Sequence, residues 1–207
     1  MSRPLDRNCQ LPELGEVDRD AGEFWVPNAF RMPQSGHNLS AWERNALFLN
    51  TGGGEFANVS FASGAEIDAD SRTAIAADFN RDGRLDLLVA SVGGGPLRLF
   101  RNRFEQAGRG IAIVLKGADS QRSGIGARIT AVVAGRRIVR DLFPEGGFAG
   151  QGPCEVLIGI GDADQCDQLL IDWPSGTRQV FESVAAGTLV RVHEDRDSLE
   201  FIEPAGP

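Results

Sequence analysis

Short apolar runs bounded by glycine turns fill the chain from about residue 108 onward, and they restrict its fold more than any other feature. Runs of this length, with turn residues between them, indicate strands rather than long helices. The chain has 26 glycines among 207 residues, and glycine supplies the positive φ that tight turns need. We therefore predict an all-β fold with a sandwich or jelly-roll-like module. The expected strands are 110–117, 127–135, 136–143, 154–161, 168–176, 177–183 and 187–194.

The region before this module contains two similar apolar segments, NALFLN and LRLFRN, each ending in asparagine. The two asparagines, Asn50 and Asn102, are 52 positions apart (102 − 50), a separation that suits one blade of a propeller-type repeat. The simplest interpretation is one complete repeat preceded by the closing strands of another. The resulting division is an extended, aromatic-containing arm at 1–44, a repeat at 45–106, a β domain at 107–195 and an acidic tail at 196–207.

A dense group of oxygen-bearing side chains lies inside the repeat, in the stretch DFNRDGRLD. Asp78, Asn80, Asp82 and Asp86 occupy positions 1, 3, 5 and 9, with Gly83 at position 6. Three carboxylates this close repel one another unless something positive lies between them. Ca²⁺ takes six to eight oxygen ligands from a tightly curled backbone, which is the arrangement that this spacing allows. The alternative is an Asp/Asn/Gly turn that binds no metal.

Two further positions define the type of loop. Arg84, at position 7, is expected to contribute its backbone carbonyl, with its side chain pointing away. Position 12, where an EF-hand needs a bidentate glutamate, is Val89, inside an expected strand. The sequence therefore favours a nine-residue Ca²⁺ loop that ends in aspartate, and not an EF-hand.

These residues resemble a known family. ADFNRDGRLDLLVAS is similar to the calcium loop of FG-GAP (VCBS) repeats, found in integrin α-chain propellers and bacterial surface proteins. SGIGARI, EGGF, GIGDAD, WPSG and VHE, between residues 123 and 194, resemble the ASPIC/UnbV domain of cartilage acidic protein and its bacterial relatives. The resemblance implies a propeller-blade-like repeat packed against a β-sandwich-like module. It also implies an extracytoplasmic location and Ca²⁺ bound by Asp78, Asn80, Asp82, Arg84 and Asp86.

Composition narrows the possible partners. The net charge of −8 argues against a nucleic-acid binder, which needs a basic face. No apolar run approaches the ~20 residues of a membrane span, and the first residues show no apolar core of a signal peptide. Of the three cysteines, Cys154 and Cys166 flank an expected strand and turn. They either form a disulfide or, as we favour, remain buried thiols.

Other polar groups carry weaker signals. Glu66, Asp68 and Asp70 favour a solvated loop over a second metal site, and turn chemistry explains the acids of GDADQCD. His193 is expected at a strand end. Neither histidine, His37 or His193, lies in a nucleophile–base pattern.

The leading hypothesis is a non-enzymatic, calcium-stabilised β module that acts as a protein-interaction unit or an accessory subunit of a larger assembly. The sequence does not decide against an enzyme, for which Asp141 and Glu145 would be the first candidate acids. Carbohydrate or matrix adhesion, as in surface members of the resembling family, is the third hypothesis.

Overall fold

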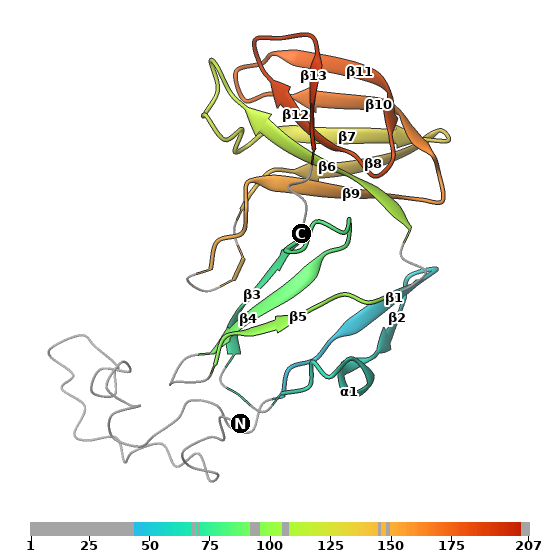
Figure 1. Cartoon of the computed structure of the whole chain (residues 1–207), viewed down its shortest axis with the longest axis vertical. Coiled ribbons are helices and arrows are strands. Elements are labelled where there is room, and N and C mark those ends of the chain that lie inside the picture. Colours follow the sequence, from blue (N-terminus) through green and yellow to red (C-terminus); the bar gives the residue numbers. More distant parts are fainter. Residues whose placement is uncertain are drawn as a thin grey trace, which may run out of the picture. The chain divides into compact units, whose positions relative to one another are not determined.

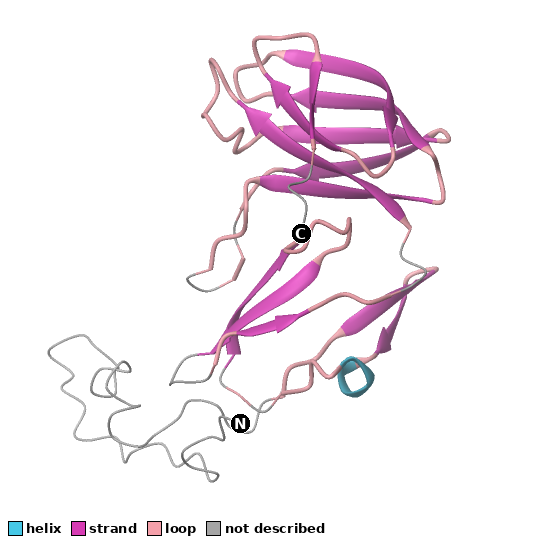
Figure 2. Ribbon diagram, viewed as in Figure 1, coloured by secondary structure: helices cyan, strands magenta, loops and turns pink. Residues whose placement is uncertain are grey.

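A computed structural model describes residues 44–67, 69, 71–91, 96–104, 108–144, 146–147 and 150–203. Apart from Arg44, the expected N-terminal arm lies outside these residues. The described part consists of strands and loops with one four-residue helix (Figure 2), which confirms the predicted all-β class. None of its helices is long and apolar enough to cross a membrane.

The chain forms two compact units. The first contains the described residues as far as Ala74, together with Val89–Phe100, and the second contains Ile75–Leu88 and the described residues from Arg101 onward. The division runs through strands β3 (Ser71–Ala77) and β4 (Asp86–Ser91). The loop between these two strands therefore belongs to the second unit.

The first unit has little core of its own. Strands β1 (Phe48–Gly52) and β2 (Glu55–Asn58) form an antiparallel ribbon in which every residue is exposed. Helix α1 (Ser60–Ser63) follows, and β5 (Arg98–Phe100) lies next to β4 in a three-stranded sheet of order β3-β4-β5. The buried apolar side chains among its described residues are Ala65, Ala69 and Val89.

The second unit is dominated by two four-stranded sheets (Figure 1). One has the order β13-β12-β6-β9, in which β12 and β6 are parallel while the other pairs are antiparallel. The other has the order β11-β10-β7-β8 and is antiparallel throughout. The strand bounds are β6 Arg109–Lys116, β7 Arg128–Val133, β8 Arg136–Asp141, β9 Glu155–Gly161, β10 Gln165–Asp172, β11 Arg178–Ala185, β12 Leu189–His193 and β13 Leu199–Ile202.

The two sheets share one apolar core, so this part of the unit is a β-sandwich. Alternate residues of a strand face opposite sides, and the inward set here is almost entirely aliphatic. Sheet β13-β12-β6-β9 contributes Ile113, Ile158 and Val192, and the facing sheet contributes Ile129 and Leu169; all five are fully buried. These residues form one continuous cluster, and burial of this much apolar surface stabilises the sandwich.

The seven strands expected from the apolar runs correspond to β6 to β12, within a few residues at each end. The two-residue turn between β7 and β8 is Ala134–Gly135, both with positive φ, the geometry that fits the twist of a hairpin. An additional strand, β13, lies in the segment expected as an acidic tail. It pairs with β12 through Leu199 and Phe201, an alternation that its acidic neighbours conceal in the sequence.

Candidate metal centre

The predicted calcium loop connects β3 to β4, as expected from the strand that follows it. Its backbone curls tightly, with positive φ at Arg81 (59°) and at Gly83 (81°). Gly83 adopts this conformation without strain, whereas Arg81 adopts it against the preference of a side chain with a Cβ. Val89 lies within β4, which confirms that the loop does not continue into an EF-hand helix.

Asp78 organises the start of the loop. Its Oδ1 accepts a hydrogen bond from the backbone N–H of Asp82 (3.1 Å), and its Oδ2 accepts one from the N–H of Gly83 (2.8 Å). The side chain of position 1 thus closes the turn on positions 5 and 6. The Asp78 carboxylate is therefore held against the backbone N–H groups of the turn.

Asp82 receives donors on both carboxylate oxygens. The Asn80 amide donates to Oδ2 (2.7 Å), and the Arg84 N–H donates to Oδ1 (3.0 Å). The Arg84 guanidinium also donates to Oδ2 (2.7 Å), so the expectation that this side chain points away is wrong. Burial raises the pKa of a carboxyl, but the hydrogen bonds from Asn80 and Arg84 outweigh it and lower the pKa of Asp82. The guanidinium supplies the positive charge that the clustered carboxylates require.

Asp86 closes the loop and is the most buried of its acids, with 1% of its surface exposed. Its Oδ1 accepts a hydrogen bond from the backbone N–H of Asn102 (2.7 Å). Its Oδ2 is buried and has no hydrogen-bond partner among the described residues. A carboxylate oxygen removed from water in this way is costly unless a cation or a donor reaches it.

The loop therefore has the oxygen types that Ca²⁺ prefers, and one of them lacks a partner. As placed, no three Asp, Glu, His or Cys side chains in the described part of the chain converge in a metal-binding group. The reason is visible in the contacts: N–H donors and Arg84 satisfy Asp78 and Asp82, and Asp86 is turned to Asn102. An ion bound by these residues would require Arg84 to leave Asp82, and the oxygen without a partner, Oδ2 of Asp86, is the one chemically suited to a cation.

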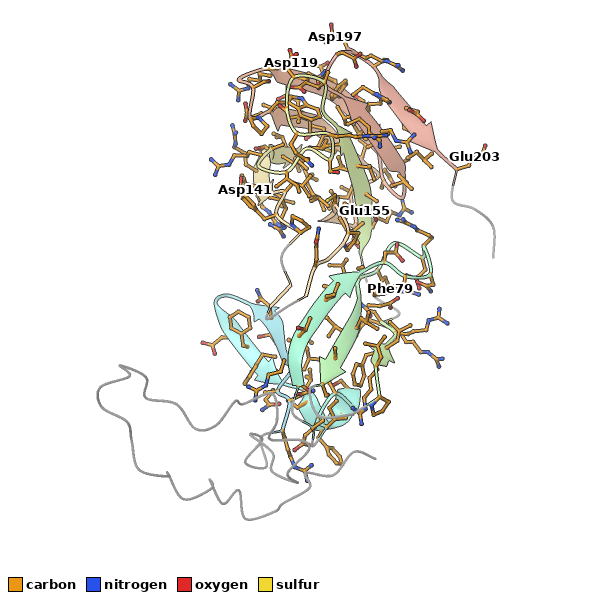
Figure 3. The ribbon with its side chains drawn as sticks, turned by 90° about the vertical axis from the view of Figure 1, so that its left-hand side faces the viewer. Phe79, Asp119, Asp141, Glu155, Asp197 and Glu203 are labelled. Atoms are coloured by element: carbon orange, nitrogen blue, oxygen red, sulfur yellow. The ribbon has the colours of Figure 1, made fainter. Side chains whose placement is uncertain are left out.

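An ion pair joins the loop to the sandwich, within the second unit. Arg81 Nη1 lies 2.7 Å from both carboxylate oxygens of Glu155, the first residue of β9. The hydrogen bond to Glu155 raises the pKa of Arg81. Figure 3 labels Phe79, in the same loop, and Glu155. Because Arg81 is also the residue with unfavourable φ, this contact helps to hold the curled backbone.

A second buried carboxylate, Glu194, organises the far part of the sandwich. It accepts hydrogen bonds from the N–H groups of Ala118 (2.6 Å) and Ser120 (2.8 Å) and from the hydroxyls of Ser120 (2.7 Å) and Ser175 (2.6 Å). Burial raises its pKa, but these donors outweigh burial and lower the pKa of Glu194 from 4.5 to about 2. Glu194 therefore joins the end of β12 to the loop that follows β6 and to the WPSG turn that follows β10, an arrangement called the Glu194 lock below.

The tryptophan of WPSG is part of the same arrangement. Trp173 is 4% exposed and packs into the core, and its indole N–H donates to Gln179 Oε1 (2.8 Å). Gln179 in turn donates to the backbone carbonyls of His193 (3.0 Å) and Arg196 (2.8 Å). The sequence motifs pointed to this region, but nothing in them indicated the burial of Glu194 and Gln179.

The remaining acidic candidates do not form sites in the described residues. In GDADQCD, Asp164 pairs with Arg109 and Asp167 accepts the N–H of Ala134 (2.8 Å), so the two acids serve different partners. Glu66 lies 3.6 Å from Arg44, while Asp68 and Asp70 lie outside the described residues. The described members of these two acid groups therefore belong to no metal-binding cluster, and the hypothesis for Glu66, Asp68 and Asp70 stays a prediction.

The structure describes both cysteines that flank the expected strand and turn. Cys154 and Cys166 are both free thiols, and Cys166 is buried.

Asp141 projects from the sandwich (Figure 3) and binds Arg128 through both oxygens, at 2.7 and 3.1 Å. The hydrogen bond from Arg128 lowers the pKa of Asp141, the opposite of what a proton-donating acid needs. His193, at the end of β12, contacts Glu200 (2.8 Å), and Glu145 lies outside the described residues.

Comparison with known proteins gives two family-model matches, one in each half of the chain. Residues 37–89 match the family model described as an FG-GAP-like repeat, and residues 117–199 match the model described as ASPIC and UnbV. FG-GAP repeats are typical of extracellular proteins and of protein interaction. No curated protein matches the chain.

Proposed function

Because the chain carries an FG-GAP-like repeat followed by an ASPIC/UnbV domain, we propose that it is a non-enzymatic, calcium-binding interaction module. It binds another protein through the apolar side chains of its repeat, as a recognition unit or accessory subunit of a larger assembly. The proposal places the protein outside the cytoplasm, where millimolar Ca²⁺ is available to a loop of moderate affinity.

The exposed apolar surface of the first unit carries the interaction part of this proposal. Phe48 is 56% exposed and Phe56 is 62% exposed. Phe48 pairs with Asn58, which lies two positions from Phe56 in β2, so both phenylalanines lie on the same face of the β1–β2 ribbon. An isolated two-stranded ribbon is marginally stable in water. Exposed apolar side chains of this size are typical of surfaces that bind another protein. The large exposed apolar side chains of this unit are Phe48, Leu49, Phe56, Phe61, Leu97 and Leu99.

The calcium part rests on the orphaned Oδ2 of Asp86. The ion would be held by the side chains of Asp78, Asn80, Asp82 and Asp86 and by the carbonyl of Arg84. Bound there, the ion would contact Asp78, which follows β3, and Asp86, the first residue of β4, and would so link the two strands. Arg84 has to exchange its contact with Asp82 for solvent, so the guanidinium and the ion compete for the same carboxylate.

Isothermal titration calorimetry tests the calcium part. The full chain should bind one Ca²⁺, and Asp82→Asn should weaken binding by at least about tenfold, because one charged ligand is lost. Asp119→Asn removes the same charge from an exposed loop of the sandwich and serves as the matched control. Equal affinity of Asp82→Asn and Asp119→Asn would contradict the site.

Capture from the native source tests the interaction part. Phe48→Ser combined with Phe56→Ser should abolish retention of the partner retained by wild type, because both changes remove apolar contact from one face. Phe201→Ser, which removes an equally exposed phenylalanine (60%) from β13, is the control. Retention of the same partner by the double variant would exclude the ribbon as the binding surface.

A further inference from the structure

The outer face of sheet β11-β10-β7-β8 has an ordered pattern that neither the proposed calcium loop nor the apolar ribbon explains. The strand register aligns its outward side chains in three rows that cross all four strands. Given in the order β11, β10, β7, β8, the first row is Arg178, Asp172, Arg128, Asp141; the second is Val180, Leu170, Thr130, Val139; and the third is Glu182, Gln168, Val132, Arg137.

The first row alternates in charge and is internally paired. Arg128 donates to Asp141 at 2.7 and 3.1 Å, and Arg178 Nε lies 3.1 Å from Asp172. Both arginines remain 59% exposed. Since a guanidinium has five N–H donors, each can bind a further carboxylate that approaches from above the sheet.

The middle row is apolar and partly open. Val180 is 50% exposed and Val139 is 42% exposed, although both lie on the face of a well-ordered sheet. Between them in the row, Thr130 is only 2% exposed. Two charged rows thus border an apolar stripe.

This pattern is complementary to itself. When the same face of a second copy is laid over it with the strands parallel, the strand order reverses, so that β11 lies over β8 and β10 over β7. Arg178 then faces Asp141 of the second copy, and Asp172 faces its Arg128. In the third row Glu182 faces Arg137, and in the middle row Val180 faces Val139. Every charge meets its opposite, which a two-fold interface requires of a single repeated surface.

Two further observations favour a second copy as the occupant. The face carries three arginines and three acids and is neutral, whereas the chain has a net charge of −8; this face therefore lacks the repulsion that other faces of two copies would meet. A hollow of about 400 Å³, lined by Gly126, Arg128, Asp141, Phe143 and Asp172, opens at the Asp141 end of the first row. In the two-fold arrangement this hollow receives Arg178 of the second copy.

We propose that this sheet face is a self-association surface through which two copies of the chain form a two-fold dimer. The face measures roughly 15 Å by 15 Å from strand and residue spacing, below the ~800 Å² per partner of a standard interface. The dimer is therefore weak and salt-sensitive. It uses none of the residues that carry the proposed calcium and partner binding.

Charge exchange between two variants tests the proposal with the full chain. In sedimentation equilibrium from about 5 to about 500 μM, wild type should shift from monomer to dimer. Asp141→Arg alone and Arg178→Asp alone should each remain monomeric, because each places like charges opposite one another twice. An equimolar mixture of the two variants should associate again, because the heterodimer restores both opposite-charge contacts.

The controls make each outcome decisive. Asp162→Arg makes the same charge change in the turn between β9 and β10, off this face, and should dimerise like wild type. A wild type that stays monomeric over the whole range overturns the proposal. Association that persists in Asp141→Arg, or a mixture that fails to recover, also overturns it and assigns any dimer to another surface.

Discussion

The sandwich and the first unit are built from the same kind of strands but are stabilised in different ways. In the sandwich, two sheets cover each other and bury large aliphatic side chains such as Ile113 and Leu169 completely. In the first unit, the largest apolar side chains are exposed, and its buried apolar residues among those described are two alanines and Val89. Periodicity alone therefore does not make a domain: strands need a facing layer, and the first unit lacks one among its described residues.

The difference separates two tasks within one chain. The sandwich has a closed core and the Glu194 lock, so it can act as a stable platform. Among the described residues, the repeat region has a ribbon whose side chains are all exposed, and the loop between β3 and β4 has a buried carboxylate oxygen without a hydrogen-bond partner. On our account, the binding functions belong to the part that is least complete by itself.

The largest expected effect comes from opening the sandwich core. Leu169→Ala removes a fully buried side chain from the centre of β10 and should lower the free energy of unfolding by about 3 kcal/mol. Leu49→Ala makes the same change at a site that is 40% exposed in β1 and should cost less than about 1 kcal/mol. Urea unfolding of both variants measures the contrast, and equal losses would remove the distinction between the units.

The Glu194 lock comes next. Glu194→Gln replaces an acceptor oxygen by an NH₂ group that faces N–H and O–H donors, and it should cost about 2 kcal/mol at pH 7. The lowered pKa sets the pH dependence: the contribution is complete above the usual pKa of 4.5 and is lost as the pH falls through about 2. The gap between wild type and variant should therefore shrink from pH 5 towards pH 2.

Urea melts at a series of pH values measure this gap, with the exposed Glu203→Gln as control. A gap that stays constant down to pH 2 would mean that the carboxylate charge of Glu194 does not stabilise the fold.

The smallest effect concerns the contact between loop and sandwich. Glu155→Gln weakens the ion pair with Arg81, whose side chain is 44% exposed, so solvent screens most of the interaction. We expect a loss of less than about 1 kcal/mol, decreasing further with added salt. Melting at low and high salt checks this, and a loss comparable to that of Leu169→Ala would show that the ion pair dominates the stability of the unit.

Much of the fold could be predicted from the sequence, because periodicity and turn residues are local. The seven sandwich strands and the Ala134–Gly135 turn follow from such signals, as does the strand that begins at Asp86. β13 was not predicted because its alternating apolar residues, Leu199 and Phe201, lie among acids. Strand pairing was not predictable either, because it depends on contacts between residues far apart in the chain.

The candidate site was predictable in its residues and not in its contacts. The spacing of Asp78, Asn80, Asp82 and Asp86 identified the loop, while the insertion of the Arg84 guanidinium and the pairing of Asp86 with Asn102 are tertiary features. The burial of Glu194 was not predictable, since no local pattern distinguishes a buried glutamate at the end of a strand from an exposed one.

The most direct test of the central claim compares thermal melts of wild type and Asp86→Asn in millimolar Ca²⁺ and in chelator. At a free Ca²⁺ concentration about 100 times the dissociation constant, the ion should stabilise wild type by about 2.7 kcal/mol. Asp86→Asn keeps the acceptor for Asn102 but removes the charge, so calcium should not shift its melting temperature. In chelator it should melt at or above wild type, because the buried unpaired charge is gone. A wild-type melting temperature that is the same with calcium and with chelator would contradict the calcium account.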